Sequence, residues 1–355
     1  MERVEHNFGL DVQRALAMLF VVLYHAPLYI PVLHDGADVG INRYLFIGLK
    51  SVTSVCVDCF WLLTGYLVSR APAFRGKALL SLWGWTLAYS WLALSLAFVT
   101  GRAPEGAELL RYVFPVLGGR YWFMSVYLVL LALAPALNAA LAAFDRRRFS
   151  GLLAVLFVVF SLLPSLHVEF AEIGHHSVTW AVVMYLVGAF LRLHVPARPG
   201  RNGHRFLVYL ACVTVGFGCL AANVFWRARF GTRLFEYDYC TFPVAALSAV
   251  ALFRLCEGLP LSAECIVARL SRRIAPFVLG VYLFHDTPIV RHYLWPLVSG
   301  PDLKTPLLLP RVFVGCVAVF IVGIVMNAAL KGAVRLVAQA CHRPNAAADI
   351  GRRGM

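Results

Sequence analysis

The sequence predicts an all-α, polytopic membrane protein with about ten transmembrane helices. Of its 355 residues, 61% are hydrophobic and 14% are charged, and the mean hydropathy is +0.75. The apolar residues form repeated runs of about 20, the length that an α-helix needs to cross the hydrocarbon core. No polar stretch is long enough for a soluble domain, so we expect one transmembrane domain over 1–335. A short basic cytoplasmic tail over 336–355 is expected to be disordered.

Charge alternates between the loops that connect the apolar runs. Arginines gather in every second loop, such as Arg146 to Arg148, and acidic residues such as Glu105 and Glu108 gather in the loops between them. One of the opposite loops, Arg227 to Arg233, breaks this pattern. With an even number of spans, this positive-inside pattern predicts that both termini are cytoplasmic. The net charge of +14 therefore belongs to membrane loops, so lipids are expected partners and nucleic acid is not. The predicted spans are roughly 10–33, 44–69, 78–100, 120–143, 149–166, 178–194, 206–226, 238–257, 275–298 and 308–332.

The first apolar run carries three ionisable side chains on one side of its predicted helix. At about 100° per residue, Arg14 and His25 fall within about 20° of each other, and Asp11 falls within about 40° of His25. His25 lies about 16 Å deeper than Arg14, and ionisable groups at such depth are costly and generally functional. We expect Arg14 to bind an anion with its planar guanidinium and His25 to act as a base. The alternative is an arginine that extends to the membrane surface and a histidine that only joins helices.

The second run offers three further candidates for a substrate site. Asp58 is a carboxylate in an apolar helix and needs a partner there, unless it lies near the outer surface. Thr64 precedes Gly65, and this small pair allows either another helix or a ligand to approach the backbone. Arg70 follows at the start of the next positively charged loop.

The fourth and ninth runs hold the remaining candidates. Arg120 and Trp122 open the fourth run, where they form either an interfacial aromatic belt or the lining of a substrate cavity. Tyr282 and His285 lie one turn apart in the ninth run and share a face. Pro288 should kink that helix, which suits a pocket, although a polar cluster at the outer surface is the alternative.

A metal site is not expected. His175 and His176 adjoin Glu169 and Glu172 in one loop, and these residues are interpreted as a solvated loop rather than as metal ligands.

Together these motifs resemble the integral-membrane acyltransferase-3 family, and within it the bacterial surface-polysaccharide O-acetyltransferases. The resemblance covers about Phe8 to Leu330. The sequence has Trp61 and Thr64 where the family usually has the second Phe and the Ser of a Phe-Phe-x-x-Ser-Gly motif. The matching segments are the Arg14–His25 spacing, Phe60 to Leu67, Arg120-Tyr-Trp-Phe, Tyr237 to Leu255, and Tyr282-Leu-Phe-His285-Asp-x-Pro288.

The resemblance implies a ten-helix domain in the bacterial inner membrane. It would move an acyl group, usually acetyl from cytoplasmic acetyl-CoA, to a hydroxyl of a cell-surface or lipid-linked glycan. Acetyl-CoA or another acyl-CoA would then be a co-substrate, and no bound cofactor is expected. By the same resemblance, His25 is the catalytic histidine, and Arg14 is its paired basic residue, a contact for the donor's phosphates. We also expect loop arginines near Arg14 to meet these phosphates, and Arg70 to lie at the substrate site.

Two questions stay open from the sequence. His25 would either deprotonate the acceptor hydroxyl or first take the acyl group itself. A transporter or exporter without covalent chemistry is the competing function, because buried ionisable residues and a kinked helix also suit a transport path. The sequence shows no internal repeat, which weighs against a transporter built from repeats.

Overall fold

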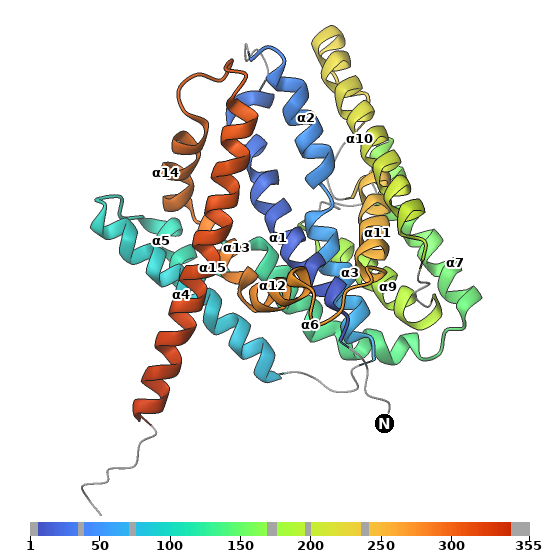
Figure 1. Cartoon of the computed structure of the whole chain (residues 1–355), viewed down its shortest axis with the longest axis horizontal. Coiled ribbons are helices and arrows are strands. Elements are labelled where there is room, and N and C mark those ends of the chain that lie inside the picture. Colours follow the sequence, from blue (N-terminus) through green and yellow to red (C-terminus); the bar gives the residue numbers. More distant parts are fainter. Residues whose placement is uncertain are drawn as a thin grey trace, which may run out of the picture.

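The computed structural model describes residues 6–34, 39–70, 76–168, 176–195, 200–235 and 241–341, and this part of the chain is helical without strands. Most helices run side by side along one direction, and the chain's first described residues lie at the same end of the molecule as the end of the last helix (Figure 1). The elements are α1 (Phe8–Tyr29), η1 (Pro31–Leu33), α2 (Asn42–Thr53), α3 (Cys56–Val68), α4 (Gly76–Val99), α5 (Gly106–Val113), α6 (Trp122–Leu141), α7 (Arg146–Phe157), the π-helical turn η2 (Val158–Leu162), α8 (Leu163–Ser165), α9 (Val178–His194), α10 (Asn202–Phe230), α11 (Pro243–Glu257), α12 (Ile266–Ile274), η3 (Ala275–Phe277), α13 (Val278–His285), α14 (Pro288–Ser299) and α15 (Leu308–Cys341).

Seven of the described helical stretches are long and apolar enough to cross a membrane, judged by length and composition. They are Phe8–Tyr29, Asn42–Val68, Gly76–Val99, Trp122–Leu141, Arg146–Ser165, Asn202–Phe230 and Leu308–Leu336. The other three predicted spans correspond to the 17-residue α9, the 15-residue α11 and the pair formed by α13 and α14. The predicted all-helical membrane fold is therefore confirmed, whereas the count of ten spans stays a prediction.

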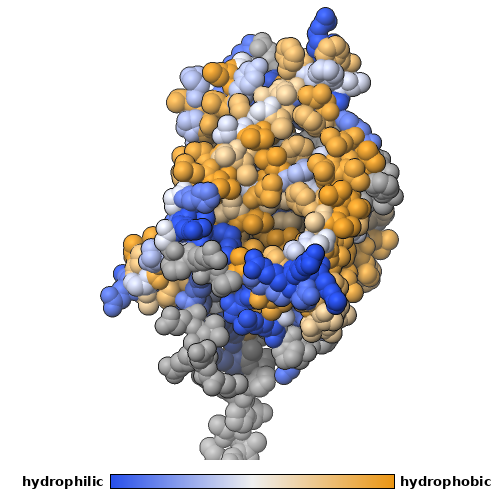
Figure 2. Space-filling view, turned by 90° about the vertical axis from the view of Figure 1, so that its right-hand side faces the viewer, coloured by the Kyte–Doolittle hydropathy of each residue, from blue (hydrophilic) through white to orange (hydrophobic). Residues whose placement is uncertain are grey.

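The outer surface has the character of a membrane-facing surface. On the side where α7 and α10 lie, a broad belt of hydrophobic residues stands above a band of hydrophilic ones (Figure 2). The apolar window of α10 is only 11% buried inside the protein, although its mean hydropathy is 2.0. Apolar side chains exposed on this scale need a lipid environment.

The second predicted span bends where small hydroxyl residues cluster. Helix α2 ends at Thr53, and α3 begins at Cys56 after a turn at Ser54. The hydroxyl of Thr53 donates to the Leu49 carbonyl at 2.8 Å, and the hydroxyl of Ser54 donates to the Ser51 carbonyl at 3.1 Å. Such bonds compete with the backbone ladder and bend helices, so one long predicted helix becomes two.

The ninth predicted span is broken rather than kinked. Helix α13 ends at His285, and Pro288 is the first residue of α14, with Thr287 in an extended conformation before it. Proline fits the first position of a helix because its missing N–H would be unpaired there. Across the break, Thr287 Oγ1 donates to the Leu283 carbonyl at 2.9 Å, and the Tyr121 hydroxyl lies 3.2 Å from that carbonyl and 3.1 Å from Thr287 Oγ1.

Helix α1 forms the centre of the bundle. It contacts α3, α11, α12, α13 and α15, and the apolar window of this helix is 61% buried. Val22 and Ala26 are completely buried. The residues at the deep end of α1 are consequently held by helices on several sides.

Helices α3 and α9 cross at a pair of glycines. A Cβ atom on Gly65 would lie 1.9 Å from the Tyr185 carbonyl oxygen, and a Cβ on Gly188 would lie 2.1 Å from the Leu62 carbonyl oxygen. Real side chains do not approach so closely, so the two backbones touch only because both residues are glycine. Of the two interpretations of the Thr64–Gly65 pair, helix packing is the one observed.

Gly188→Ala should lower stability, because its methyl group would overpack a backbone contact that cannot yield. We expect a loss of about 1–3 kcal/mol, measured by thermal unfolding of the purified protein in detergent. Gly84→Ala in α4 is the matched control, since nothing lies within 4 Å of its added Cβ. The control should gain about 0.5–1 kcal/mol from helix propensity, and equal effects of the two changes would contradict the tight crossing.

The end of the chain departs from the predicted boundary. Helix α15 continues past Arg335 to Cys341, so the first residues of the predicted tail are helical. Residues 342–355 lie outside the described residues, as do 236–240 at the start of the predicted eighth span.

Candidate functional site

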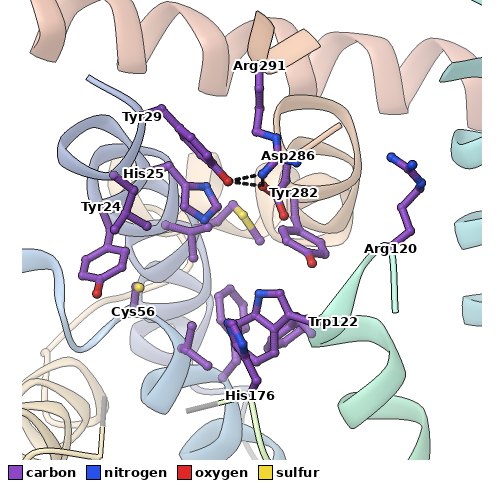
Figure 3. Close-up of a pocket in the computed structure, with 16 residues that line it drawn as sticks. Tyr24, His25, Tyr29, Cys56, Arg120, Trp122, His176, Tyr282, Asp286 and Arg291 are labelled. Carbon is purple, nitrogen blue, oxygen red and sulfur yellow. Dashed lines mark hydrogen bonds and ion pairs between the residues drawn. The ribbon is translucent and has the colours of Figure 1, made fainter. Parts of the chain in front are cut away.

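A pocket of about 370 Å³ lies against the second half of α1. Its walls come from α1, α3, the start of α6, and the break between α13 and α14 (Figure 3). His25 and Tyr29 line it from α1, and Asp286 and Arg291 line it from the broken span. Most of the remaining lining is apolar or aromatic, which is typical of a pocket that binds an organic substrate and orients it with a few polar groups.

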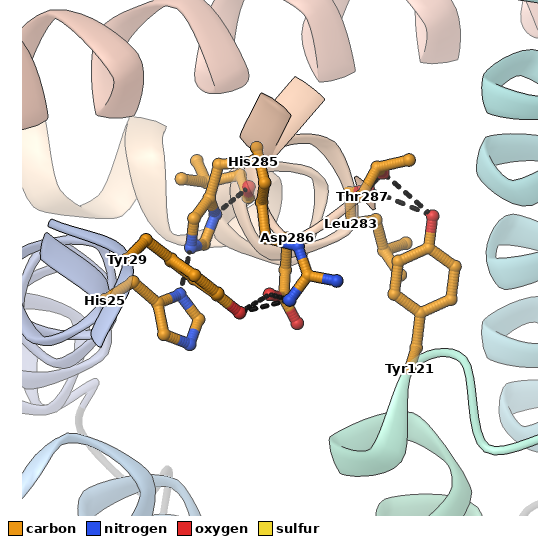
Figure 4. Close-up of polar contacts among 9 residues, drawn as sticks. His25, Tyr29, Tyr121, Leu283, His285, Asp286 and Thr287 are labelled. Carbon is orange, nitrogen blue, oxygen red and sulfur yellow. Dashed lines mark hydrogen bonds and ion pairs between the residues drawn. The ribbon is translucent and has the colours of Figure 1, made fainter. Parts of the chain in front are cut away.

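His25 is joined to a second histidine behind the pocket wall. Its Nδ1 lies 2.7 Å from Nε2 of His285, and Nδ1 of His285 lies 2.6 Å from the Val281 carbonyl oxygen. The other nitrogen of His25 points away from His285 (Figure 4). His285 is completely buried and does not line the pocket, so at this wall His25 is the one histidine among the described residues that borders the pocket.

A second polar group lies beside this histidine pair. The Tyr29 hydroxyl donates to Asp286 Oδ1 at 3.2 Å, and Arg291 donates through Nη1 to the same hydroxyl. Arg291 Nη1 also forms an ion pair with Asp286 Oδ1 at 3.5 Å, and its guanidinium lies over the Tyr29 ring, 4.8 Å from the centroid. A partly buried cation, fixed by two partners, therefore stands at the polar side of the pocket.

The opposite wall is aromatic. Phe123 stacks on Trp61 with ring centroids 4.5 Å apart, and the Trp122 ring lies 4.1 Å from the His176 ring. Phe123 also contacts the Tyr282 ring edge-on at 5.7 Å. Of these residues, Trp122, Phe123, His176 and Tyr282 line the pocket. The prediction that Trp122 and Tyr282 lie at a cavity agrees with this placement.

Arg120 also reaches the pocket, but its charge is already engaged. It forms an ion pair with Glu108 of α5, and its guanidinium lies 3.5 Å from the centroid of the Tyr112 ring. Its side chain is only 2% exposed. These contacts hold the short α5 against the start of α6, so Arg120 shapes the pocket as well as lining it.

The shallow part of α1 does not reach this pocket. Arg14 pairs with Asp11 at 3.6 Å, and Asp11 also contacts His6 at 2.6 Å. Arg14 and Asp11 lie near the start of α1, about 16 Å and about 21 Å along the helix axis from His25, respectively. The shared helix face is therefore present, but only its deeper part borders the pocket.

Three other predicted residues lie away from the pocket. Asp58 is completely buried and accepts a hydrogen bond from Trp180 Nε1 at 2.9 Å, which joins α3 to α9. Thr64 donates to the Phe60 carbonyl at 2.7 Å. Arg70 is exposed after the end of α3. For Asp58 and Thr64 the structure supplies structural partners, and their predicted contacts with substrate stay untested.

The sequence analysis did not select the polar group around Tyr29, although two signals were present. Tyr29 lies four residues after His25 and thus on the same helix face. Asp286 and Arg291 directly follow the His285 motif, on both sides of Pro288. Their meeting with Tyr29 depends on the helix break, which sequence spacing alone does not specify.

No metal centre is present among the described residues, which contain no group of three or more His, Cys, Asp or Glu side chains able to hold an ion. His175, Glu169 and Glu172 lie outside the described residues. His176, the neighbour of His175, packs its ring against Trp122 instead.

Comparison with known proteins identifies the family. Residues 7–328 match the acyltransferase domain that defines the acyltransferase-3 family. No curated protein and no solved structure matched the chain. The match covers most of the chain and includes every residue of the pocket and of the histidine pair. The chain therefore belongs to the acyltransferase-3 family and is an integral-membrane acyltransferase.

Proposed function

We propose that this enzyme transfers an acetyl or similar acyl group from an acyl-CoA to a hydroxyl of a glycan, with His25 as the general base. The observation that carries the proposal is the placement of His25. Its ring lines the pocket, one nitrogen is bound to buried His285, and the other is left for a substrate. A histidine suits this task because its ordinary pKa lies close to neutral pH.

The reaction follows from that placement. A hydroxyl of the acceptor donates its proton to Nε2 of His25 while its oxygen attacks the thioester carbonyl. The new C–O bond forms, the C–S bond breaks, and the proton passes from His25 to the departing thiolate. Arg291 stands beside this centre, and a fixed cation in a site with little water stabilises the negative charge that develops on the carbonyl oxygen.

The shape and lining of the pocket support a sugar as the acceptor. Sugar rings have apolar C–H faces that pack on aromatic rings, and Trp122 and Phe123 offer such a wall. The hydroxyl groups of a sugar need polar partners, which Tyr29, Asp286 and Arg291 supply on the other side of the pocket. A lipid-linked or cell-surface glycan in the bacterial inner membrane meets both requirements.

The donor would reach the pocket from the end of the molecule at which α1 begins. An acyl-CoA is a long molecule whose phosphates lie far from its thioester, so a spacing of about 16 Å between Arg14 and His25 suits the two ends of one donor. Arg14 is partly exposed, with 31% of its side chain accessible. We assign it to the donor's phosphates and place that end of the protein in the cytoplasm.

Arg14→Ala should therefore raise KM for the donor and change kcat little, because the lost contact is made equally in the ground and transition states. We expect KM to rise about tenfold, which corresponds to the loss of one charge-assisted contact of about 1.4 kcal/mol. Initial rates over a range of acetyl-CoA concentrations measure both constants. Arg147→Ala, an exposed arginine of α7, is the control, and an unchanged KM in Arg14→Ala would exclude the assigned contact.

The proposal as a whole is tested with radiolabelled acetyl-CoA and purified protein in lipid vesicles, with a set of lipid-linked and soluble glycans as acceptors. We expect label in the glycan fraction and stoichiometric release of free CoA. A transporter would leave the thioester intact, and that result would overturn the proposal. Rapid denaturation at neutral pH without acceptor should leave no label on the protein, whereas labelled His25 would show an acyl carrier instead of a base.

A further inference from the structure

The histidine pair ends at a backbone carbonyl, and this ending fixes where its protons lie. A carbonyl oxygen only accepts hydrogen bonds, so Nδ1 of His285, 2.6 Å from the Val281 oxygen, must carry a hydrogen. A neutral imidazole has a single N–H. Nε2 of neutral His285 is therefore an acceptor.

The same reasoning extends to His25. Its Nδ1 lies 2.7 Å from Nε2 of His285, and one of two hydrogen-bonded nitrogens must be the donor. Because His285 Nε2 accepts, His25 Nδ1 donates and carries the hydrogen. The Nε2 of neutral His25, which points away from His285 (Figure 4), then carries no hydrogen and keeps its lone pair.

From this series of hydrogen bonds we infer that His285 is a positioning residue that holds His25 in the tautomer required of a general base. This inference rests on the proposed function. His285 is completely buried and does not line the pocket, so it acts through His25 and not on a substrate. Without this partner, His25 would be free to carry its hydrogen on Nε2, where it would block proton removal from the acceptor. The bond that one ring nitrogen makes sets the state of the other.

The hydrogen bonds from His25 through His285 to the Val281 carbonyl do not carry a proton away from the site. A backbone carbonyl does not take up a proton, so the proton gained by His25 Nε2 stays there until it leaves toward the thiolate. His25 Nδ1 keeps its hydrogen bond to His285 in both the neutral and the protonated state. His285 thus orients the ring through the whole reaction with no proton transfer of its own.

Two variants of equal length separate the acceptor from the mere filling of space. His285→Gln places an amide oxygen near the former Nε2 position, where it can still accept from His25 Nδ1. His285→Met fills similar volume without a strong acceptor. We expect kcat to fall about 10²–10³-fold in His285→Met with KM for both substrates unchanged, and His285→Gln to keep most of the activity. A fall in kcat in His285→Gln as large as in His285→Met, or an unchanged kcat in His285→Met, would overturn the inference.

Solid-state NMR of protein carrying isotope-labelled histidine gives a readout that does not depend on turnover. The ring-carbon signals that disappear in His25→Ala belong to His25, and we expect them to report hydrogen on Nδ1 in the unmodified protein and in His285→Gln. In His285→Met they should shift toward hydrogen on Nε2. Unchanged His25 signals in His285→Met would contradict the inference.

The proposed function and the inference fail in different ways. Full activity of His25→Ala in the same assay would reject His25 as the base. An inactive His25→Ala with a fully active His285→Met would keep the base and reject the positioning role alone. Unaltered KM values, with monodisperse elution of each variant in detergent, show that a low kcat does not come from misfolding.

Discussion

His25→Ala should abolish acyl transfer. Removal of the imidazole leaves the acceptor hydroxyl without a base, and general-base catalysis commonly contributes about 10²–10⁴-fold to a rate. We expect kcat to fall by at least about 10³-fold, because no other side chain on the His25 wall of the pocket presents an imidazole nitrogen in the described residues. Steady-state transfer of labelled acetyl to a glycan measures the effect.

The loss should be chemical and not structural. His25 lies at the pocket wall, so its truncation opens the pocket, and its main structural cost is the hydrogen bond that buried His285 loses. Thermal unfolding should show a loss of about 1–3 kcal/mol, too small to unfold the protein, and KM for the donor should stay near its original value. His204→Ala, an exposed histidine of α10, is the matched control with full activity. Transfer by His25→Ala within threefold of the unmodified rate would remove His25 from the mechanism.

Arg291→Met should damage both stability and activity. Its guanidinium is the cation paired with Asp286, whose side chain is only 7% exposed, and removing one member of a buried pair leaves an uncompensated charge. Because 29% of the Arg291 side chain is exposed, we expect a loss of about 2–3 kcal/mol, near the lower end for such pairs. Thermal unfolding in detergent measures the change.

A double variant separates the two effects. Asp286→Asn removes the orphaned charge, so Arg291→Met with Asp286→Asn should recover most of the lost stability. Activity should not recover, since the cation proposed to stabilise the reacting carbonyl is still absent, and the loss of such a group costs about 10²–10³ in kcat. Recovery of both, or of neither, would contradict the separate roles of Arg291.

The membrane fold could be predicted because apolar runs of span length are a local property of the sequence. The limits of that reasoning appear at Ser54 and at Pro288. Each interrupts a continuous apolar run, and whether a helix bends, kinks or breaks there depends on neighbours that satisfy the freed polar groups. At the break before Pro288, Thr287 donates to the Leu283 carbonyl, and the distant partner that joins this contact is Tyr121, more than 160 residues earlier in the chain.

The candidate site was predictable in part for the same reason. His25 and His285 stand out as ionisable residues in apolar helices, whereas their separation of 2.7 Å is a tertiary fact. The face shared by Arg14 and His25 follows from helix geometry, but which part of it borders a pocket depends on the helices around it. Asp58 met the same criterion of a buried ionisable group, and the structure gives it Trp180 as a partner.

The glycine crossing of α3 and α9 has a consequence for the shape of the pocket. Backbones that touch at Gly65 and Gly188 cannot slide past each other, so the wall that α3 contributes is fixed in place. The apolar windows of α4 and α6 are each only 28% buried, against 67% for the stretch that contains α3. The α3 wall of the pocket is thus held by a backbone contact with α9, whereas α4 and α6 leave most of their apolar windows unburied by the rest of the protein.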